Sequence, residues 1–273
     1  MKRVFAWLFF LALGGGLTAA LFFFYIARSL PSSQLITAQR IPQSTKIYDR
    51  TGAVLLYEIH GEEKRTTIPF DSIPLFLKQA TIALEDANFY THAAFEPKSL
   101  LRAFWFDLRN RGALQGGSTI TQQLAKNAFL SPERTLTRKV KELLLAFQLE
   151  RRFTKDEILN LYLNYIPYGA NTYGVEAASQ AFFGKSAKDL LLPEAATLAA
   201  VAKAPTRYSP WGGHLDELLA RKNLTLERMF KEGFITEKVR DEAREYALNF
   251  VPQLTGIKAP HFVIAIQDYL ANA

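Results

Sequence analysis

The sequence predicts a mainly α-helical globular domain with a short β element near its start and a transmembrane helix at its N-terminus. Three observations support this prediction. Apolar residues recur at helical spacing through most of the chain beyond Pro74. The stretch from residue 46 to residue 57 has the pattern of two short strands around a turn. The uncharged run over residues 4–27 is long enough to cross a bilayer, which takes about 20 apolar residues in a helix.

The composition limits the class of protein. With 273 residues the chain can form one large or two small domains and can bury a core. Its formal net charge of +7 suits an anionic partner: a phosphate-bearing substrate, an acidic membrane surface or nucleic acid. Charge alone does not separate these partners. Because the chain has no cysteine, a disulfide framework, a thiolate metal site and a cysteine nucleophile are excluded.

The N-terminal run over residues 4–27 is interpreted as an uncleaved anchor. Trp7 and Tyr25 lie near its two ends, where amphipathic rings favour the membrane interface. A cleaved signal peptide has a shorter apolar core and a small-x-small cleavage site, which residues 27–29 match poorly. We therefore expect a single-pass protein with residues 1–3 as the cytoplasmic tail and the rest of the chain outside.

The remaining segments follow from composition and pattern. Residues 28–45 are polar with two prolines, as in a linker, and the globular domain is expected over residues 46–250. Two strands are predicted around an Asp-Arg-Thr-Gly turn at residues 49–52, and residues 65–68 fit a third strand. Helical spacing, caps and breakers predict helices over residues 75–85, 98–111, 138–150, 155–164, 173–183, 193–203, 214–231 and 236–248, with a further helix start at residues 131–133.

A glycine-rich turn at residues 116–117 leads into one more predicted helix. Ser118 or Thr119 can cap this helix, and Thr119 with Gln122 has the capping-box pattern. Free backbone N–H groups at such a terminus, with the positive end of the helix dipole, form an anion site. The alternative is a capped surface helix whose polar residues, up to Asn127, face solvent.

Carboxylates lie on two other predicted helices. Glu85 and Asp86 end the first, where one could act as a general base while the other is held by hydrogen bonds. The alternative is a solvated acidic helix end. His92 is a poor metal ligand because no second histidine lies at ligand spacing, so no metal site is predicted. Arg138 and Glu142 lie four residues apart, as in an ordinary surface salt bridge.

Together these features suit one type of chemistry. Two carboxylates, Glu85 and Glu142, fall in the same helical span as the predicted anion site. The cations in that span are Lys126, Arg134, Arg138 and Lys139. Glycosyl transfer with a phosphate leaving group needs such a set, because a carboxylate must deprotonate the acceptor hydroxyl while cations neutralise the departing phosphate.

On five ordered motifs the chain resembles the peptidoglycan glycosyltransferase module of class A penicillin-binding proteins and of monofunctional peptidoglycan glycosyltransferases. The first three motifs are Glu85-Asp86-x-x-Phe89-x-x-His92, Gly117-Ser118-Thr119-Ile120-Thr121-Gln122-Gln123-Leu124-x-Lys126-Asn127 and Arg138-Lys139-x-x-Glu142-x-x-x-Ala146-x-x-Leu149-Glu150. The last two are Lys155-x-x-Ile158-Leu159-x-x-Tyr162-Leu163-Asn164 and Glu194-Ala195-Ala196-x-Leu198-Ala199, the latter followed by Pro205, Tyr208 and Pro210. One departure is Ala94, where the first motif usually has glycine. If that glycine takes a positive φ, Ala94 is strained.

The resemblance implies a lysozyme-like, mostly helical fold with a smaller membrane-proximal lobe. It also implies polymerisation of lipid II, with the growing glycan on undecaprenyl pyrophosphate as donor. Glu85 would then be the general base, and Glu142 would assist near the pyrophosphate. One direct displacement would invert the donor sugar. The substrate-binding residues implied are Asp86, Phe89, His92, Ser118, Thr119, Gln122, Gln123, Lys126, Asn127, Arg134, Arg138 and Lys139.

The resemblance requires no cofactor, and it leaves a divalent cation (Mg²⁺ or Mn²⁺) at the pyrophosphate open. The implied partners are lipid II, the growing glycan, membrane lipid and other cell-wall synthesis proteins. Nucleic acid is not among them, since no zinc-finger spacing or recognition-helix signature occurs. The implied location is the bacterial cytoplasmic (inner) membrane, with the catalytic domain on its outer side.

Two alternatives stay open, and one segment is left over. A lysozyme-like glycan-cleaving enzyme could use a related scaffold, because fold does not fix function. A non-catalytic membrane-anchored binder of glycan or lipid is the other reading. Residues 251–273 resemble the linker into a transpeptidase domain. No Ser-x-x-Lys or Lys-Thr-Gly motif occurs in the 273 residues, so no transpeptidation is expected of this chain.

Overall fold

The computed structural model describes most of the globular part of the chain and scattered N-terminal residues. The described residues are 5, 7, 9, 10, 13–17, 25, 26, 28, 30, 45–52, 55–59, 64–94, 118–130, 135–253 and 259–271.

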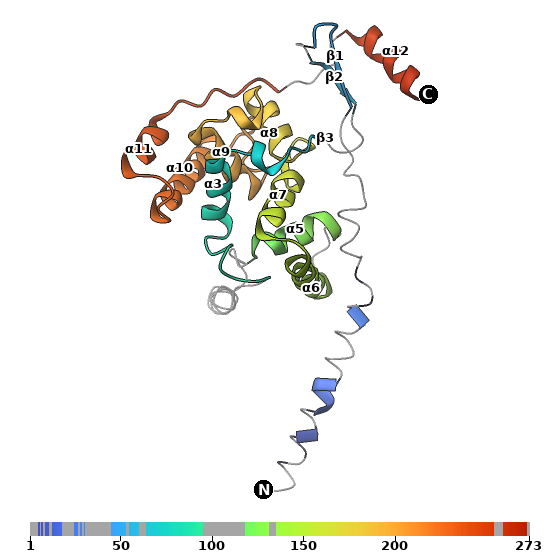
Figure 1. Ribbon diagram of the computed structural model, residues 1–273, viewed down its shortest axis with the longest axis vertical. Helices are drawn as coiled ribbons and strands as arrows, with labels where there is room; N and C mark the ends of the chain where they lie inside the picture. The colour runs from blue at the N-terminus through green and yellow to red at the C-terminus, as the bar shows by residue number, and fades with distance from the viewer. Residues whose placement is uncertain are drawn as a thin grey trace.

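Helices dominate these residues, as the sequence predicts (Figure 1). The α-helices are α3 (Leu75–Glu85), α5 (Ile120–Phe129), α6 (Leu136–Arg152), α7 (Lys155–Tyr165), α8 (Val175–Phe183), α9 (Leu192–Ala202), α10 (Leu215–Lys231), α11 (Glu237–Glu245) and α12 (Pro260–Ala271). Two short 3₁₀ helices are η1 (Phe70–Ser72) and η2 (Ala187–Asp189). The helices expected over residues 98–111 and from residues 131–133 lie outside the described residues.

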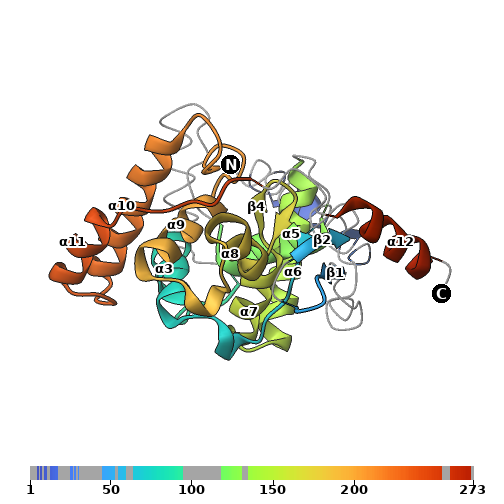
Figure 2. The same cartoon turned by 90° about the horizontal axis from the view of Figure 1, so that it is seen from above.

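The predicted hairpin near the start of the domain is confirmed. Strand β1 (Thr45–Tyr48) pairs antiparallel with β2 (Leu55–Ile59). Gly52 has a φ of 72° and its N–H donates to the carbonyl of Asp49. A residue with a side chain is strained at such a φ, which is why glycine ends this turn. The hairpin and α12 lie together at one side of the molecule, opposite α10 and α11 (Figure 2).

A second, three-stranded sheet differs from the prediction. Strand β3 (Lys64–Arg65) runs parallel to β5 (Thr172–Tyr173), and β5 pairs antiparallel with β4 (Pro167–Gly169). The third strand expected over residues 65–68 is therefore shorter, and it joins this sheet rather than the hairpin. The helix expected to begin at Tyr173 begins two residues later, because that residue takes up a strand hydrogen-bond ladder. The partners lie about a hundred residues apart, beyond the reach of local pattern.

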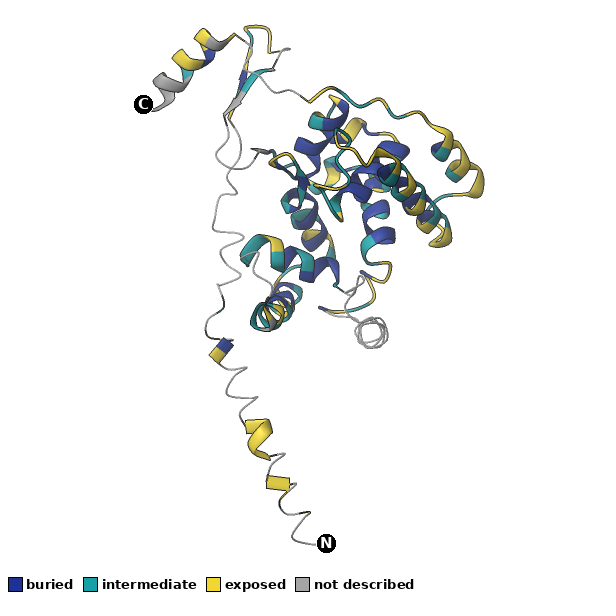
Figure 3. Ribbon diagram, turned by 180° about the vertical axis from the view of Figure 1, so that it is seen from behind, coloured by how far each residue is buried: buried dark blue, intermediate teal, exposed yellow. Residues whose placement is uncertain are grey.

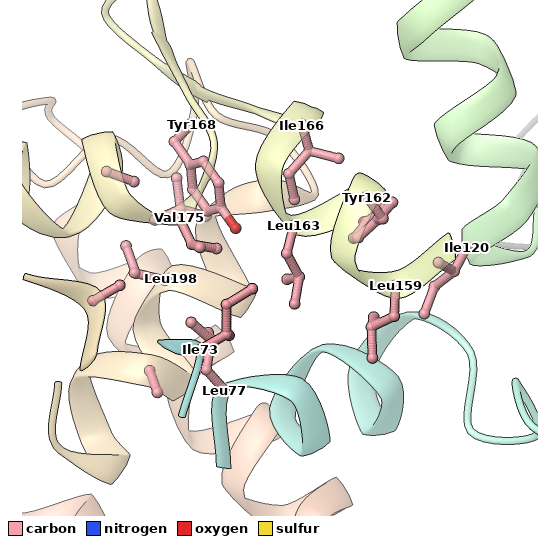
Figure 4. Close-up of a cluster of buried hydrophobic side chains, with 14 of the residues drawn as sticks. Ile73, Leu77, Ile120, Leu159, Tyr162, Leu163, Ile166, Tyr168, Val175 and Leu198 are labelled. Carbon is pink, nitrogen blue, oxygen red and sulfur yellow. The ribbon is translucent and has the colours of Figure 1, made fainter. Parts of the chain in front are cut away.

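The main core lies between α3, α5, α6, α7, α8 and α9 (Figure 4). Its bulky members include Tyr162, Tyr168, Phe89 and Phe182, all fully buried. Each large apolar side chain that leaves water contributes roughly 1.5–3 kcal/mol. A second cluster joins α3 and α9 to α10 and α11 through Ala83, Leu84, Ala196, Leu226 and Met229, among others. The two clusters fix the end of α3 between α5 on one side and α10 on the other.

Local signals explain where several helices begin and end. Thr154 caps α7, in a capping box with Glu157. Gly174 precedes α8 with a φ of 79°, and a Cβ atom there would lie 2.7 Å from the carbonyl oxygen of Asn164. Gly184 closes α8 in the left-handed conformation. The predicted stop of this helix is thus confirmed.

The N-terminal segment is helical at the positions that the structure describes between residues 5 and 26. Large apolar side chains are exposed there (yellow at the lower end of Figure 3). Among the described residues, no helix has the length and apolarity needed to span a bilayer. The structure therefore supports the mainly helical part of the predicted fold, and much of the predicted transmembrane run lies outside the described residues.

Candidate active site

Glu85 is the last residue of α3, and its carboxylate lies between α5, α9 and α10. Oε2 accepts a hydrogen bond of 2.8 Å from the Gln123 amide, and Lys203 Nζ lies 3.7 Å from the same oxygen. Oε1 lies 3.8 Å from Arg221 Nη2 and has no hydrogen-bond partner in the described part of the chain. The side chain is 3% exposed. One oxygen is thus held in place while the other keeps its lone pairs free.

Asp86, the next residue, is held by structural hydrogen bonds. Its Oδ1 lies 2.6 Å from Nε2 of His92, and its Oδ2 accepts the backbone N–H of Ile120 at 3.0 Å. Burial raises the pKa of Asp86, and these two hydrogen bonds oppose the rise. Phe89 is fully buried in the main core beside this pair. Asp86, Phe89 and His92 therefore shape the site and tie the end of α3 to the start of α5.

The anion site expected at the start of α5 is already occupied by the protein. The N–H of Ile120 donates to the Asp86 carboxylate, and the N–H of Gln122 donates to the hydroxyl of the cap, Thr119. The prediction of free backbone donors is therefore wrong for these two groups. The terminus does bind a carboxylate, as the helix dipole favours, but that carboxylate belongs to Asp86, the C-cap of α3.

The predicted capping box at α5 is replaced by a longer-range contact. Thr119 is the N-cap, but the Gln122 amide donates to the carbonyl of Ala94 at 3.0 Å instead of turning back to the cap. The Thr119 hydroxyl donates to the same carbonyl at 3.1 Å. Ala94 is fully buried and is not among the non-glycine residues with positive φ. The backbone strain that a positive φ would cause at Ala94 is therefore absent.

Gln123 is oriented by a tyrosine from α7. The Tyr162 hydroxyl donates to Gln123 Oε1 at 3.1 Å, so the amide nitrogen of Gln123 faces Glu85. Burial raises the pKa of Tyr162 well above its ordinary value, which keeps this donor protonated. Two successive hydrogen bonds, from Tyr162 to Gln123 and from Gln123 to Glu85, therefore connect α7 to the carboxylate.

Glu142 is a buried residue of α6 and not half of an exposed salt bridge. It is 2% exposed, and its Oε1 lies 2.5 Å from Lys139 Nζ. Lys139 also donates to the Ser118 hydroxyl at 2.9 Å, and that hydroxyl lies 3.5 Å from the same carboxylate oxygen. Arg138, the partner expected from the spacing, has a buried Nε without a hydrogen bond to any described residue. Lys139, three residues before Glu142, is its partner because Ser118 and Gln122 hold the lysine from the α5 side.

Cations gather around Lys126 on α5. Burial is the largest cause of the lowered pKa of Lys126, and the Glu142 carboxylate opposes the shift. The cations that lower it further are Arg138, Lys203 and Lys139. Like charges this close repel unless an anion lies between them. The site is therefore suited to bind a phosphate or a pyrophosphate.

Two predicted residues stand outside this network. Asn127 is exposed on α5. Arg134 lies outside the described residues.

Comparison with known proteins identifies the family. The family model for transglycosylases matches residues 52–230. The chain belongs to the transglycosylase family. It is 43% identical over 247 residues to penicillin-binding protein 1A of Aquifex aeolicus (strain VF5), a match covering 90% of this chain and 34% of that protein. With penicillin-binding protein 1A of Escherichia coli (strain K12), identity is 43% over 251 residues, covering 91% and 29% of the two chains.

A solved structure resembles this transglycosylase-family chain more weakly. Penicillin-binding protein 1A from Haemophilus influenzae aligns with a TM-score of 0.47 and 22% identity, over 86% of this chain and 25% of that one. The chain spans about a third of the length of the curated relatives it matches. The resemblance to the glycosyltransferase region of class A penicillin-binding proteins is confirmed, and with it the assignment of the chain as an enzyme of peptidoglycan glycosyltransferase type.

Sequence reasoning missed two cations of the transglycosylase site, Lys203 and Arg221. The available signal for Lys203 was its place in the chain, just before Pro205 of the fifth motif. Arg221 lies on an amphipathic helix where arginine is common, and nothing local distinguishes it. No group of three or more metal-ligating side chains occurs within the described residues. Whether a divalent ion binds at the pyrophosphate stays an open prediction.

Proposed function

We propose that this transglycosylase domain polymerises lipid II into β-1,4 glycan strands, displacing undecaprenyl pyrophosphate with inversion at the donor sugar. The family assignment supports the enzyme class. The arrangement around Glu85 and Lys126 supports the mechanism, since it combines a carboxylate that has one free oxygen with a group of cations.

Glu85 is the general base in this proposal. Its Oε1 takes the proton from the acceptor hydroxyl of N-acetylglucosamine as that oxygen forms a bond to the donor anomeric carbon. The bond from that carbon to the pyrophosphate breaks at the same time, and its electron pair leaves with the phosphate. One displacement inverts the configuration, so no glycosyl-enzyme forms. Gln123, held by Tyr162, orients the base without neutralising it.

The cations around Lys126 neutralise the leaving group. Lys126 and Arg138 are partly buried, and the Nε of Arg138 has no hydrogen bond to the described residues. In a site that excludes water, such donors stabilise developing negative charge more strongly than they would in bulk solvent. Ser118 completes the binding surface, which Asn127 and Arg134 join by resemblance alone.

Glu142 acts through Lys139 in this mechanism. Lys139 and the Ser118 hydroxyl both contact its Oε1, so that oxygen is poorly placed to accept a substrate proton. A buried carboxylate paired in this way holds an ammonium in one position. Glu142 therefore orients the pyrophosphate-binding lysine.

The single observation that carries the proposal is the free Oε1 of Glu85. It is tested by incubating the wild-type chain, Glu85→Gln and Glu217→Gln with labelled lipid II and measuring polymer on gels. Glu85→Gln should lose about a hundredfold to ten-thousandfold in rate, since a positioned base contributes about 10²–10⁴. The control, a surface carboxylate paired with Arg207, should keep full activity.

Binding and a second substrate complete that test. Glu85→Gln should still bind lipid II, because the cations are intact. Wild-type rates in Glu85→Gln would remove the base from the mechanism. Cleavage of preformed glycan, without polymerisation of lipid II, would show a glycan-cleaving enzyme instead.

We propose further that residues 4–27 anchor the chain in the bacterial cytoplasmic membrane, with the catalytic domain outside. The uncharged run and the aromatic residues at its ends support this anchor. A substrate with a polyprenyl tail stays in the bilayer, which favours an enzyme held at its surface. The full chain should resist extraction from membranes at alkaline pH, and a variant lacking residues 1–28 should be released. Equal release of both would exclude the anchor.

A further inference from the structure

We propose that α10 positions the candidate general base through two arginines. Arg221 holds the carboxylate of Glu85 by charge, and Arg228 holds the backbone of the preceding residue, Leu84. The inference rests on the proposed function, because it concerns how the base of that reaction is placed.

Arg228 ties the last turn of α3 to α10. The final four carbonyls of a helix have no partner within the helix. One of them, the Leu84 carbonyl, accepts a hydrogen bond of 2.6 Å from Arg228 Nη1. The same turn ends in Glu85, so this contact fixes the backbone that carries the base. Leu84 also packs in the cluster that contains Leu226 and Met229 of α10.

Arg221 approaches the carboxylate itself and is held by other contacts. Its Nε donates to the carbonyl of Ala200 at 3.2 Å, and its guanidinium lies 5.4 Å from the ring centre of Tyr208. Its Nη2 lies 3.8 Å from Oε1 of Glu85. That separation is too long for a hydrogen bond, so the charge attracts the carboxylate without occupying the oxygen that must accept a proton.

The spacing on α10 places both arginines on the side facing α3. They are seven residues apart, which is close to two turns of helix. The helix packs against both α3 and α9. Because the apolar residues between the arginines hold the register of α10 on α3, the two contacts form together.

The groups around Glu85 come from five elements. Facing it are Lys203 after α9, Arg221 on α10, Gln123 on α5, Tyr162 on α7 and Tyr168 on β4, with Asp86 next in the chain. Burial raises the pKa values of both tyrosines, so they stay neutral while the enzyme works. The side chain of Lys203 is 42% exposed and that of Arg221 19%. Arg221 is therefore the less screened of the two cations at the carboxylate.

The first experiment compares Arg221→Gln with Arg240→Gln in the full chain on labelled lipid II. Arg240 is a matched control, because it is also largely buried and ion-paired to α10 through Glu227 but does not touch Glu85. Arg221→Gln should lower kcat/KM about tenfold to a hundredfold. The loss should fall on kcat with KM nearly unchanged, because the guanidinium acts on the base and not on the bound substrate.

Two further variants separate charge from structure. Arg221→Lys keeps the charge, so it should restore much of the lost kcat. Arg228→Gln should also lower kcat, since Arg228 holds the backbone that carries the base. A kcat of Arg221→Gln that matches that of Arg240→Gln would overturn the proposal while leaving the glycosyltransferase function in place.

A double-mutant cycle on thermal unfolding tests the contact without any activity. The drop in Tm for Glu85→Gln with Arg221→Gln should be smaller than the sum of the two single changes. The same cycle with Arg240→Gln should be additive. Coupling in a chain that does not polymerise lipid II would support the pairing and count only against the proposed function. Additive changes in the Arg221 cycle would overturn the pairing, whatever the activity.

Discussion

Buried carboxylates in α8 and α9 are bonded differently from those at the site. Glu176 on α8 accepts hydrogen bonds from the Ala187 N–H at 2.8 Å, from Ser186 at 3.1 Å and from Gln180 at 3.2 Å. Glu194 on α9 pairs with Lys185 at 2.7 Å and accepts the N–H of its own helix cap. Both carboxylates thus take donors from the chain, and neither has an oxygen that is buried without a partner among the described residues.

The site leaves comparable groups incompletely satisfied. Glu85 keeps a free Oε1, Arg138 keeps a free Nε within the described chain, and Lys126 lies partly buried among like charges. Orphaned buried polar atoms destabilise a fold by about 1–3 kcal/mol each, and a ligand that satisfies them recovers this cost. Arg244, outside the site, also keeps an Nε that is orphaned among the described residues, so the contrast between the two regions lies in their carboxylates.

The largest expected contrast comes from truncating one carboxylate in each region. Glu176→Ala leaves the buried Ala187 N–H without an acceptor and should lower the free energy of unfolding by about 3 kcal/mol, with little change in activity per folded molecule. Glu85→Ala should lower it by less, because the Gln123 amide also contacts the Ser118 carbonyl, and should reduce lipid II polymerisation about a hundredfold to ten-thousandfold. Denaturant titration and rate measurements on both variants check this. Equal losses of stability would remove the distinction between the regions.

A smaller effect is expected from Lys126→Arg. Burial favours the neutral amine, so the pKa of Lys126 lies below the ordinary lysine value of 10.5. In the wild type, kcat/KM should fall as pH rises through that lowered pKa, while arginine stays charged and should move the alkaline limb upward. The free energy of unfolding changes with pH in the opposite direction to the rate. Between the lowered pKa and 10.5 the unfolded chain binds more protons, so unfolding free energy rises with pH. If the alkaline limb does not move, deprotonation of Lys126 does not cause the fall of kcat/KM at high pH.

The smallest expected effect comes from removing two cap hydroxyls, one at the site and one away from it. Thr119→Ala at α5 and Thr154→Ala at α7 should each lower the unfolding free energy by about 1 kcal/mol, since each hydroxyl caps a helix. Only Thr119→Ala should also lower activity several-fold, because the α5 start carries Gln122 and Gln123 into the site. Thermal melts and initial rates, measured on the same preparations, test the pair. A comparable rate loss in Thr154→Ala would mean that activity reports stability alone.

Much of the helical framework and the list of candidate residues could be predicted from sequence. Thr154 and Gly184 marked helix ends by local rules, and the structure has both. The motif spacing named Glu85, Lys126 and Lys139, which the structure brings into one region. Spacing alone gave the wrong partner for Glu142, because an i,i+3 and an i,i+4 neighbour are equivalent until another helix selects one.

The sequence by itself determined the helix and strand types, the charge balance and the residue types at the site, because these depend on periodicity, caps and composition. Only the tertiary structure decided that Asp86 fills the start of α5, that β3 joins β5, and that Arg221 reaches Glu85. The physical reason is common to all three. A polar group buried by folding must find its partner wherever packing brings one near, and that partner lies far along the chain.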